Sequence, residues 1–217
     1  MKRIFDEELH GLYTRFMNMG TAVNDAVAKS VKGFVLHDVS LAKEVIDADV
    51  AINEEEVKIE KDSFTLIALQ QPVSSDLRKI VAMMKSTNDL ERIADHAVSI
   101  SNATINVKGN ERLLTIEGKL EEMASVVEDM LSRVLSAYVT VDVDAARQIV
   151  LEDEKVDNYL TQIHHEVVEG IVENPSAAKG GVEYVLVAGY LERIGDYITN
   201  ICERIVYMET GQILTLN

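Results

Sequence analysis

Apolar residues recur at intervals of three and four along most of this chain. The pattern is clear between residues 77 and 97, where the apolar positions include Leu77, Ile80, Met84, Leu90 and Ile93. This spacing is the period of an amphipathic α-helix. No segment alternates between apolar and polar residues in the way that a half-buried strand does. The pattern therefore predicts an all-α protein.

Residues that favour the ends of helices divide the chain into six long helices. We predict these helices at residues 5–36, 39–70, 74–107, 113–139, 143–173 and 176–209. The end signals occur at matching places in the two halves: Asp38 and Asp142 as N-caps, Pro72 and Pro175 at a first helical position, and Gly109 and Gly211 after a helix end. Helices this long with short connections lie antiparallel to their neighbours.

The two halves also share a sequence motif. DLERIADH at residues 89–96 recurs as YLERIGDY at residues 190–197, an offset of 101 residues. Such self-similarity is the signature of a duplicated structural unit. We therefore expect two repeated antiparallel three-helix bundles, one over residues 1–109 and one over residues 110–217, in a pseudo-twofold arrangement.

Composition and charge narrow the possible functions. The chain has two prolines, eleven glycines and no tryptophan, which favours helix over a sheet rich in turns. Its net charge is −16, of which −4 falls on residues 1–108 and −12 on residues 109–217. Such a surface repels nucleic-acid phosphate and anionic lipid, and it attracts cations. We therefore expect no nucleic-acid partner.

The apolar runs and the cysteine count indicate where the protein works. Charged residues interrupt every apolar run before it reaches membrane-spanning length, and the first residues lack the long apolar stretch of a signal peptide. The lone cysteine, Cys202, excludes an internal disulfide framework. We expect a cytoplasmic protein without direct membrane insertion, in which Cys202 is a buried structural thiol.

Oxygen-bearing side chains form a stripe along the last predicted helix. Intervals of four, four and three residues keep the members of the stripe on one helix face: Glu192, Asp196, Asn200 and Glu203. The preceding helix carries Asp153 and Asp157 at the same four-residue spacing. Facing each other across an antiparallel helix pair, the two sets would form an all-oxygen site. Such a site suits hard cations such as Mg²⁺, Mn²⁺, Ca²⁺ or oxidised iron.

The first half carries a less acidic version of this arrangement. Its predicted ligands are Asp49 on the second helix and Glu91 and Asp95 on the third. Uncharged residues stand where the second half has Asp157, Asn200 and Glu203, namely Asn53, Ser99 and Asn102. The affinity of a hard cation rises with the charge of its ligands. We therefore expect tighter binding at the second set.

Two alternatives to a non-catalytic metal-binding protein remain open. In one, Arg193, Arg204 and Lys155 neutralise the acids, and the protein is a metal-free helical scaffold. In the other, the acids form a carboxylate-bridged metalloenzyme site. That chemistry normally pairs Glu with E-x-x-H motifs, and no such motif aligns with Glu192 or Asp153.

The repeated motifs resemble the signatures of the PhoU family. The segments that carry the likeness are Leu191–Asp196, Thr199–Ile201, Glu203, Tyr207 and Gly211 in the second repeat, and Asp76–Arg78 and Leu90–His96 in the first. Length, repeat spacing and helix count fit as well, so the resemblance covers nearly the whole chain. The chain departs from the family pattern at Ala94, Tyr197, Ser99 and Asn102.

The resemblance implies a regulator and not an enzyme. It implies a negative regulator of phosphate uptake and phosphate-starvation signalling, often a homodimer. Its implied partners are the ATPase of the Pst phosphate transporter and a PhoR-type sensor kinase. It further implies that E/D-x-x-x-D pairs hold a divalent or multinuclear metal, with magnesium, manganese, iron and zinc as candidates.

Overall fold

The structure is a computed structural model that describes residues 2–216, and over that range it contains helices and no strand. The helices are α1 (Lys2–Leu36), α2 (Val39–Gln70), α3 (Ser75–Val107), α4 (Leu114–Thr140), α5 (Val143–Val150), α6 (Asp153–Glu173) and α7 (Ala178–Thr210), with a short 3-10 turn, η1 (Pro175–Ala177), before α7. The predicted all-α fold is confirmed.

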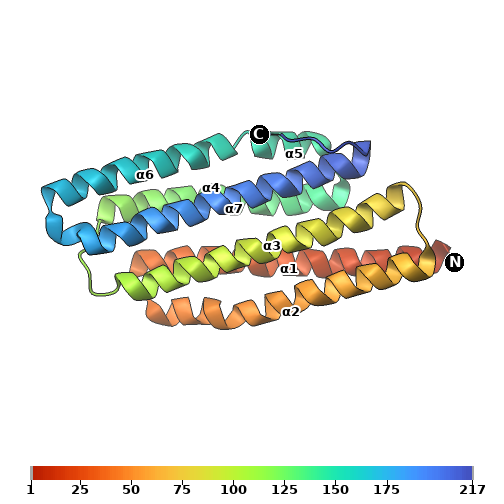
Figure 1. The fold of residues 1–217 in the computed structure, drawn as a ribbon, viewed down its shortest axis with the longest axis horizontal. Coiled ribbons are helices and arrows are strands. Elements are labelled where there is room, and N and C mark those ends of the chain that lie inside the picture. The colour runs from red at the N-terminus through yellow and green to blue at the C-terminus, as the bar shows by residue number, and fades with distance from the viewer. Residues whose placement is uncertain (1, 217) are drawn as a thin grey trace.

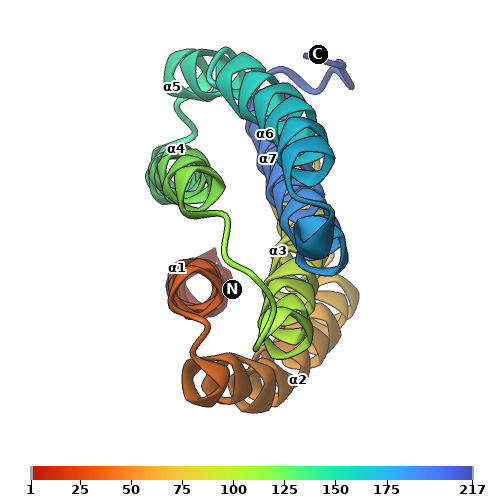
Figure 2. The same cartoon turned by 90° about the vertical axis from the view of Figure 1, so that its left-hand side faces the viewer.

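The helices form two three-rod units that lie side by side. Helices α1, α2 and α3 make the first unit, and α4, α7 and the α5–α6 pair make the second (Figure 1). Seen end-on, α2, α3, α7 and α6 form one curved layer, and α1 and α4 lie against its concave side (Figure 2). The units meet where α1 packs on α4 and where α3 packs antiparallel on α7. We call this four-helix contact the seam.

Several predicted helix ends are confirmed by hydrogen bonds. Asp38 Oδ1 accepts from the backbone N–H groups of Ser40 and Leu41, at 2.9 and 3.2 Å. Asp142 Oδ1 accepts from Ala145 N at 2.9 Å in the same way. Gly211 has a left-handed φ of 73° and closes α7 by donating its N–H to Tyr207 O at 2.9 Å. These caps satisfy backbone groups that a helix end otherwise leaves without partners.

Pro72 departs from the prediction, whereas Pro175 agrees with it. Pro175 is the first residue of η1, and the Asn174 side chain accepts from Ser176 N at 3.2 Å. Pro72 instead follows the left-handed cap of α2 at Gln71, three residues before α3 begins. A proline directly after a helix cap prevents the helix from continuing. The prediction was wrong because this proline ends α2 and does not start α3.

The predicted continuous helix over residues 143–173 is also wrong, because a turn at Leu151 and Glu152 separates α5 from α6. Asp153 and Glu154 therefore lie in the first turn of a new helix. Negative side chains are favourable there because the N-terminal end of the helix dipole is positive. The break makes Asp153, a predicted metal ligand, the first residue of α6.

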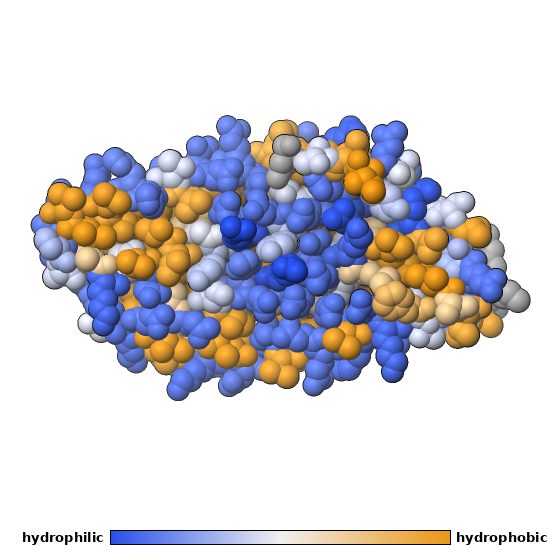
Figure 3. Space-filling view, in the orientation of Figure 1, coloured by the Kyte–Doolittle hydropathy of each residue, from blue (hydrophilic) through white to orange (hydrophobic). Residues whose placement is uncertain are grey.

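The apolar stripes of the helices meet in one core that extends across the seam. Its largest fully buried side chains include Phe16, Phe34, Tyr138 and Tyr184, which come from α1, α4 and α7. On the outer face of the curved layer, hydrophilic residues fill the middle and more hydrophobic residues gather towards both ends (Figure 3). Among residues 2–216, no helix is long and apolar enough to cross a membrane.

Candidate functional site

Four predicted ligands of the second repeat lie within electrostatic range of one another. Asp153 and Asp157 project from the start of α6, and Glu192 and Asp196 from the middle of α7. Burial, followed by the charges of the other three, raises the pKa of Asp153 to about 6. These four residues are the second cluster below.

Glu192 and Asp196 respond to the same environment. Burial and then the charge of Asp196 raise the pKa of Glu192. Burial also raises the pKa of Asp196, although Arg193 opposes the shift. Like charges held together in a half-buried place favour either protonation or a compensating cation.

The first repeat holds a matching group between α2 and α3. Burial raises the pKa of Asp49, and Asp95 adds to the shift, while the Asn53 amide opposes it by donating to Asp49 Oδ2 at 2.8 Å. Burial and the charges of Asp95, Glu56 and Asp49 raise the pKa of Glu91. The first cluster is therefore Asp49, Glu56, Glu91 and Asp95.

Glu56 is the member of the first cluster that sequence reasoning missed. It lies seven residues after Asp49, which is two turns along the same helix face. That spacing was a signal available in the sequence. The corresponding position in the second repeat is Leu160, so each cluster has four carboxylates. The charge count alone therefore no longer favours tighter binding at the second cluster.

Two other predicted ligands have separate surroundings. Glu203 Oε1 accepts a hydrogen bond from Leu216 N at 3.0 Å, which ties the end of the chain to α7. Its charge also raises the pKa of Asp89 on α3. Asn200 is half-buried one turn beyond Asp196. In the first repeat, Ser99 Oγ donates to Asp95 O at 3.0 Å, within its own helix.

Basic side chains do not pair with the clusters. Lys155, one of the proposed neutralising residues, instead forms an ion pair with Glu152. Among residues 4–216, whose side chains the structure describes, no ion pair within 4.0 Å involves any of the eight carboxylates of the two clusters. Arg193 nevertheless acts on Glu192 and Asp196 through its charge, without a direct ion pair.

The donor chemistry of the clusters suits a hard metal ion. Every donor is an oxygen, and Asp49 Oδ1 and Asn53 Oδ1 are buried without a hydrogen-bond partner. Buried carboxylate and amide oxygens without partners are costly unless something binds them. The side chains do not yet converge, because no group of three or more acidic, His or Cys side chains in the described chain is placed to hold an ion. Binding would require side-chain rotations.

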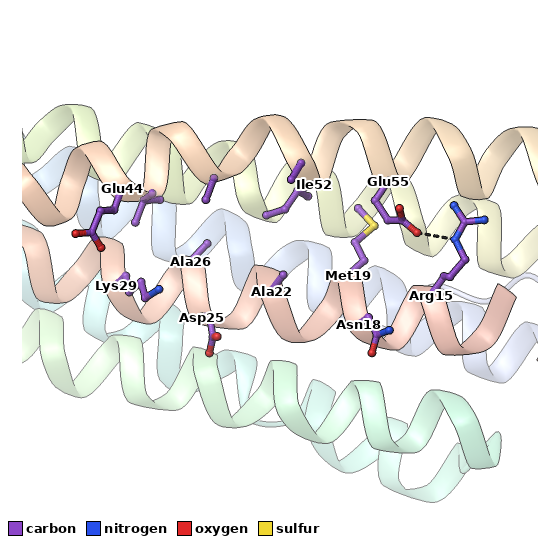
Figure 4. Close-up of a pocket in the computed structure, with 13 residues that line it drawn as sticks. Arg15, Asn18, Met19, Ala22, Asp25, Ala26, Lys29, Glu44, Ile52 and Glu55 are labelled. Atoms are coloured by element: carbon purple, nitrogen blue, oxygen red, sulfur yellow. Dashed lines mark hydrogen bonds and ion pairs between the residues drawn. The ribbon is translucent and has the colours of Figure 1, made fainter. Parts of the chain in front are cut away.

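Two further features lie apart from the clusters. Cys202 is buried, and burial raises the pKa of its thiol to about 12, so it is a structural thiol as expected. A groove of about 570 Å³ runs between α1 and α2, with Met19, Ala22, Ala26 and Ile52 among its lining (Figure 4). At its rim, Arg15 Nε pairs with Glu55 Oε1 at 2.6 Å. No cluster residue lines this groove.

Comparison with known proteins identifies the family. The PhoU domain model matches residues 16–104 and again residues 120–205. A PhoU homolog of Streptococcus pneumoniae serotype 4, named as a phosphate-specific transport system accessory protein, is 36% identical over 217 residues and 100% of both chains. The corresponding homolog of Clostridium acetobutylicum is 33% identical over 100% of this chain and 99% of its own. This chain belongs to the PhoU domain family.

Solved structures of PhoU proteins have the same fold as this chain. The crystal structure of the phosphate transport system regulatory protein PhoU from Streptococcus pneumoniae superposes with a TM-score of 0.90 at 35% identity, covering 97% of this chain and 99% of that one. PhoU from Pseudomonas aeruginosa gives a TM-score of 0.91 at 30% identity, covering 96% of this chain and 100% of that one. The bundle architecture is therefore that of the PhoU proteins.

Proposed function

We propose that this protein is a negative regulator of phosphate uptake and phosphate-starvation signalling. The observation that carries the proposal is the full-length match to phosphate-specific transport system accessory proteins, at 36% identity over 100% of both chains. The matched structure from Streptococcus pneumoniae is titled a phosphate transport system regulatory protein. Regulation by binding, without catalysis, is the role that these names support.

The partners in this proposal are the ATPase of a Pst-type phosphate transporter and a PhoR-type sensor kinase. Contact with an ATPase subunit and with a kinase would place the protein in the cytoplasm, where a single reduced cysteine is ordinary. A homodimer is part of the same proposal. We assign the protein a restraining role when phosphate is plentiful.

A clean deletion tests the regulatory role. In phosphate-rich medium, the deletion strain should take up phosphate excessively or express phosphate-starvation genes, and the wild-type gene should restore repression. Normal repression in the deletion strain would overturn the proposal. Affinity capture of the native protein from cells grown in high and low phosphate tests the partners, because the transporter ATPase or the sensor kinase should be recovered.

We further infer that both clusters bind metal, with magnesium, manganese, iron or zinc as the candidates. Asp49, Glu56, Glu91 and Asp95 would hold it in the first repeat, and Asp153, Asp157, Glu192 and Asp196 in the second. A bound cation would offset the repulsion among four carboxylates in each cluster. Elemental analysis of the untagged protein separates this proposal from a metal-free scaffold. An oxidase assay on the iron-loaded form separates it from a metalloenzyme.

A further inference from the structure

The seam between the repeats has a polar cluster at each of its two ends. The two ends occupy equivalent places in the two repeats. By sequence offset, Tyr13 at one end corresponds to Glu117 at the other, and Met83 corresponds to Tyr184. We call them the linker end, where residues 108–113 join α3 to α4, and the open end, where α3 begins and α7 finishes. The two ends differ in how well their buried polar groups are paired.

At the linker end, one buried carboxylate gathers several donors. Glu117 is 2% exposed, and Tyr184 donates its hydroxyl to Glu117 Oε1 at 2.6 Å. Arg112 binds the same carboxylate through Nε at 3.0 Å and through Nη2 at 2.5 Å. His37 Nε2 lies 3.3 Å from Oε1. Burial alone would raise the pKa of Glu117, but the bonds from Arg112 and Tyr184 outweigh it and lower the pKa.

This network crosses from one repeat to the other. Arg112 Nη2 also donates to Val35 O on α1, at 2.6 Å. Leu113 N donates to the Tyr184 hydroxyl at 3.2 Å, and the Tyr184 ring packs edge-on against Phe34 with ring centres 5.1 Å apart. One carboxylate therefore ties together α1 of the first repeat, the linker, and α4 and α7 of the second.

Between the middle of the seam and the open end, several buried polar groups are poorly paired. Asp89 Oδ2, near the middle of α3, and Arg204 Nε, six residues before the end of α7, are buried without a hydrogen-bond partner. Tyr138 Oη on α4 and Ser86 Oγ on α3 are also buried and interact with each other, but without an aligned hydrogen bond. No ion pair within 4.0 Å joins Asp89 to Arg204 in the described structure.

Two hydrogen bonds that cross the open end are long. Arg78 Nε donates to Met208 O at 3.5 Å, and the Tyr13 hydroxyl lies 4.0 Å from Met208 Sδ. Both distances are at the limit of a hydrogen bond. No chain connection joins the repeats at this end, because the linker is at the other.

We infer that the seam is latched at the linker end by Glu117 and opens first at the open end. Opening the linker end would break charge-assisted hydrogen bonds and leave a carboxylate without its donors, which is costly. Opening the other end would return unpaired buried polar groups to water, which is favourable for those groups. Opening at one end, with the other end held, changes the angle between α3 and α7. It therefore changes the placement of the two carboxylate clusters relative to each other.

Hydrogen exchange of the full-length protein tests the latch, and the repeat supplies matched segments. Residues 30–37 and 180–187 lie at the linker end, and residues 134–141 and 79–86 are their counterparts at the open end. In the wild-type protein, amides of the open-end segments should exchange about tenfold faster or more. Equal rates at both ends, or slower exchange at the open end, would overturn the inference.

Substitution of the latch sharpens the test. Glu117→Gln keeps the side-chain size and removes the charge, so exchange at residues 30–37 and 180–187 should rise about tenfold. The control is Glu121→Gln, one turn along α4 at an exposed position, which should leave the difference intact. Wild-type exchange in Glu117→Gln would refute the latch. If Glu117→Gln fails to fold by circular dichroism, Tyr184→Phe decides the matter, because it removes one hydroxyl and should show the same local rise.

Discussion

Asp153 packs directly on Gly195, with its Oδ1 atom 2.6 Å from the point where a Cβ atom on residue 195 would stand. Because residue 195 has no side chain, the Asp153 carboxylate can lie against the backbone of α7. We predict that Gly195→Ala displaces the Asp153 carboxylate and weakens Mn²⁺ binding at the second cluster. The protein should stay folded, because the end of a flexible side chain can move.

The matched control for this substitution is Gly189→Ala. Gly189 lies on the same helix, and a Cβ atom there would meet nothing within 4 Å. Replacing a helical glycine by alanine stabilises a helix by about 0.5–1 kcal/mol. Gly189→Ala should therefore raise the thermal midpoint and leave Mn²⁺ titration unchanged. Equal Mn²⁺ affinity in both variants would show that Gly195 has no part in the cluster.

Titration of metal-stripped protein with Mn²⁺ tests the clusters separately. Glu192→Gln/Asp196→Asn should abolish binding in the second repeat and spare the first. Glu91→Gln/Asp95→Asn should do the reverse, because each double substitution removes half of the carboxylates of one cluster. Wild-type protein without saturable binding would contradict the metal proposal and favour the scaffold.

Glu56 provides a finer test of the first cluster. We predict that Glu56→Gln weakens Mn²⁺ binding there by about tenfold, because it removes one of four negative donors. Glu54→Gln is the control, since Glu54 lies two residues away on an exposed face, paired with Lys58 at 3.3 Å. If both variants titrate like the wild-type protein, Glu56 is only a neighbour of the site.

Periodicity and end signals predicted most of the helices, because both are local properties. The Asp38 and Asp142 side chains bind backbone N–H groups only two or three residues further along the chain, so the local sequence is enough to predict these caps. The break before Asp153 was missed because the apolar period continues through it. A turn of one or two residues hardly changes that period.

The candidate site was predictable only in part. Spacing identified Asp49, Glu91 and Asp95 on their helix faces, but it cannot tell which acids of two helices meet. Glu56 joined the first cluster through the packing of α2 on α3. Glu203 lies on the predicted stripe, and its contact with Leu216 depends on the path of the chain after α7. Contacts of this kind are set by tertiary structure.

The close packing of α1 on α4 gives a prediction about stability. A Cβ atom on Gly20 would stand 2.8 Å from Leu135 Cδ1, and Leu135 is buried in the seam. Gly20→Ala should therefore destabilise the fold by about 1–3 kcal/mol through overpacking. Gly11→Ala, where a Cβ atom meets nothing within 4 Å, should be neutral or stabilising. Urea denaturation measures both, and a stable Gly20→Ala would show that the seam yields easily.

Asp89 makes the stability of the fold depend on pH. Burial raises the pKa of Asp89 from 3.8 to about 6, although Arg204 opposes the shift. The folded protein therefore binds this proton more tightly than the unfolded chain does. The resulting stabilisation is complete below pH 3.8 and is lost as the pH rises through about 6, a change on the order of 3 kcal/mol. Asp89→Asn should raise the urea midpoint at about pH 7.5 and flatten its rise towards about pH 5. The control is Asp47→Asn at an exposed position, which should change neither the urea midpoint nor its dependence on pH. A lower urea midpoint for Asp89→Asn at about pH 7.5 would instead show that the Asp89 charge stabilises the seam.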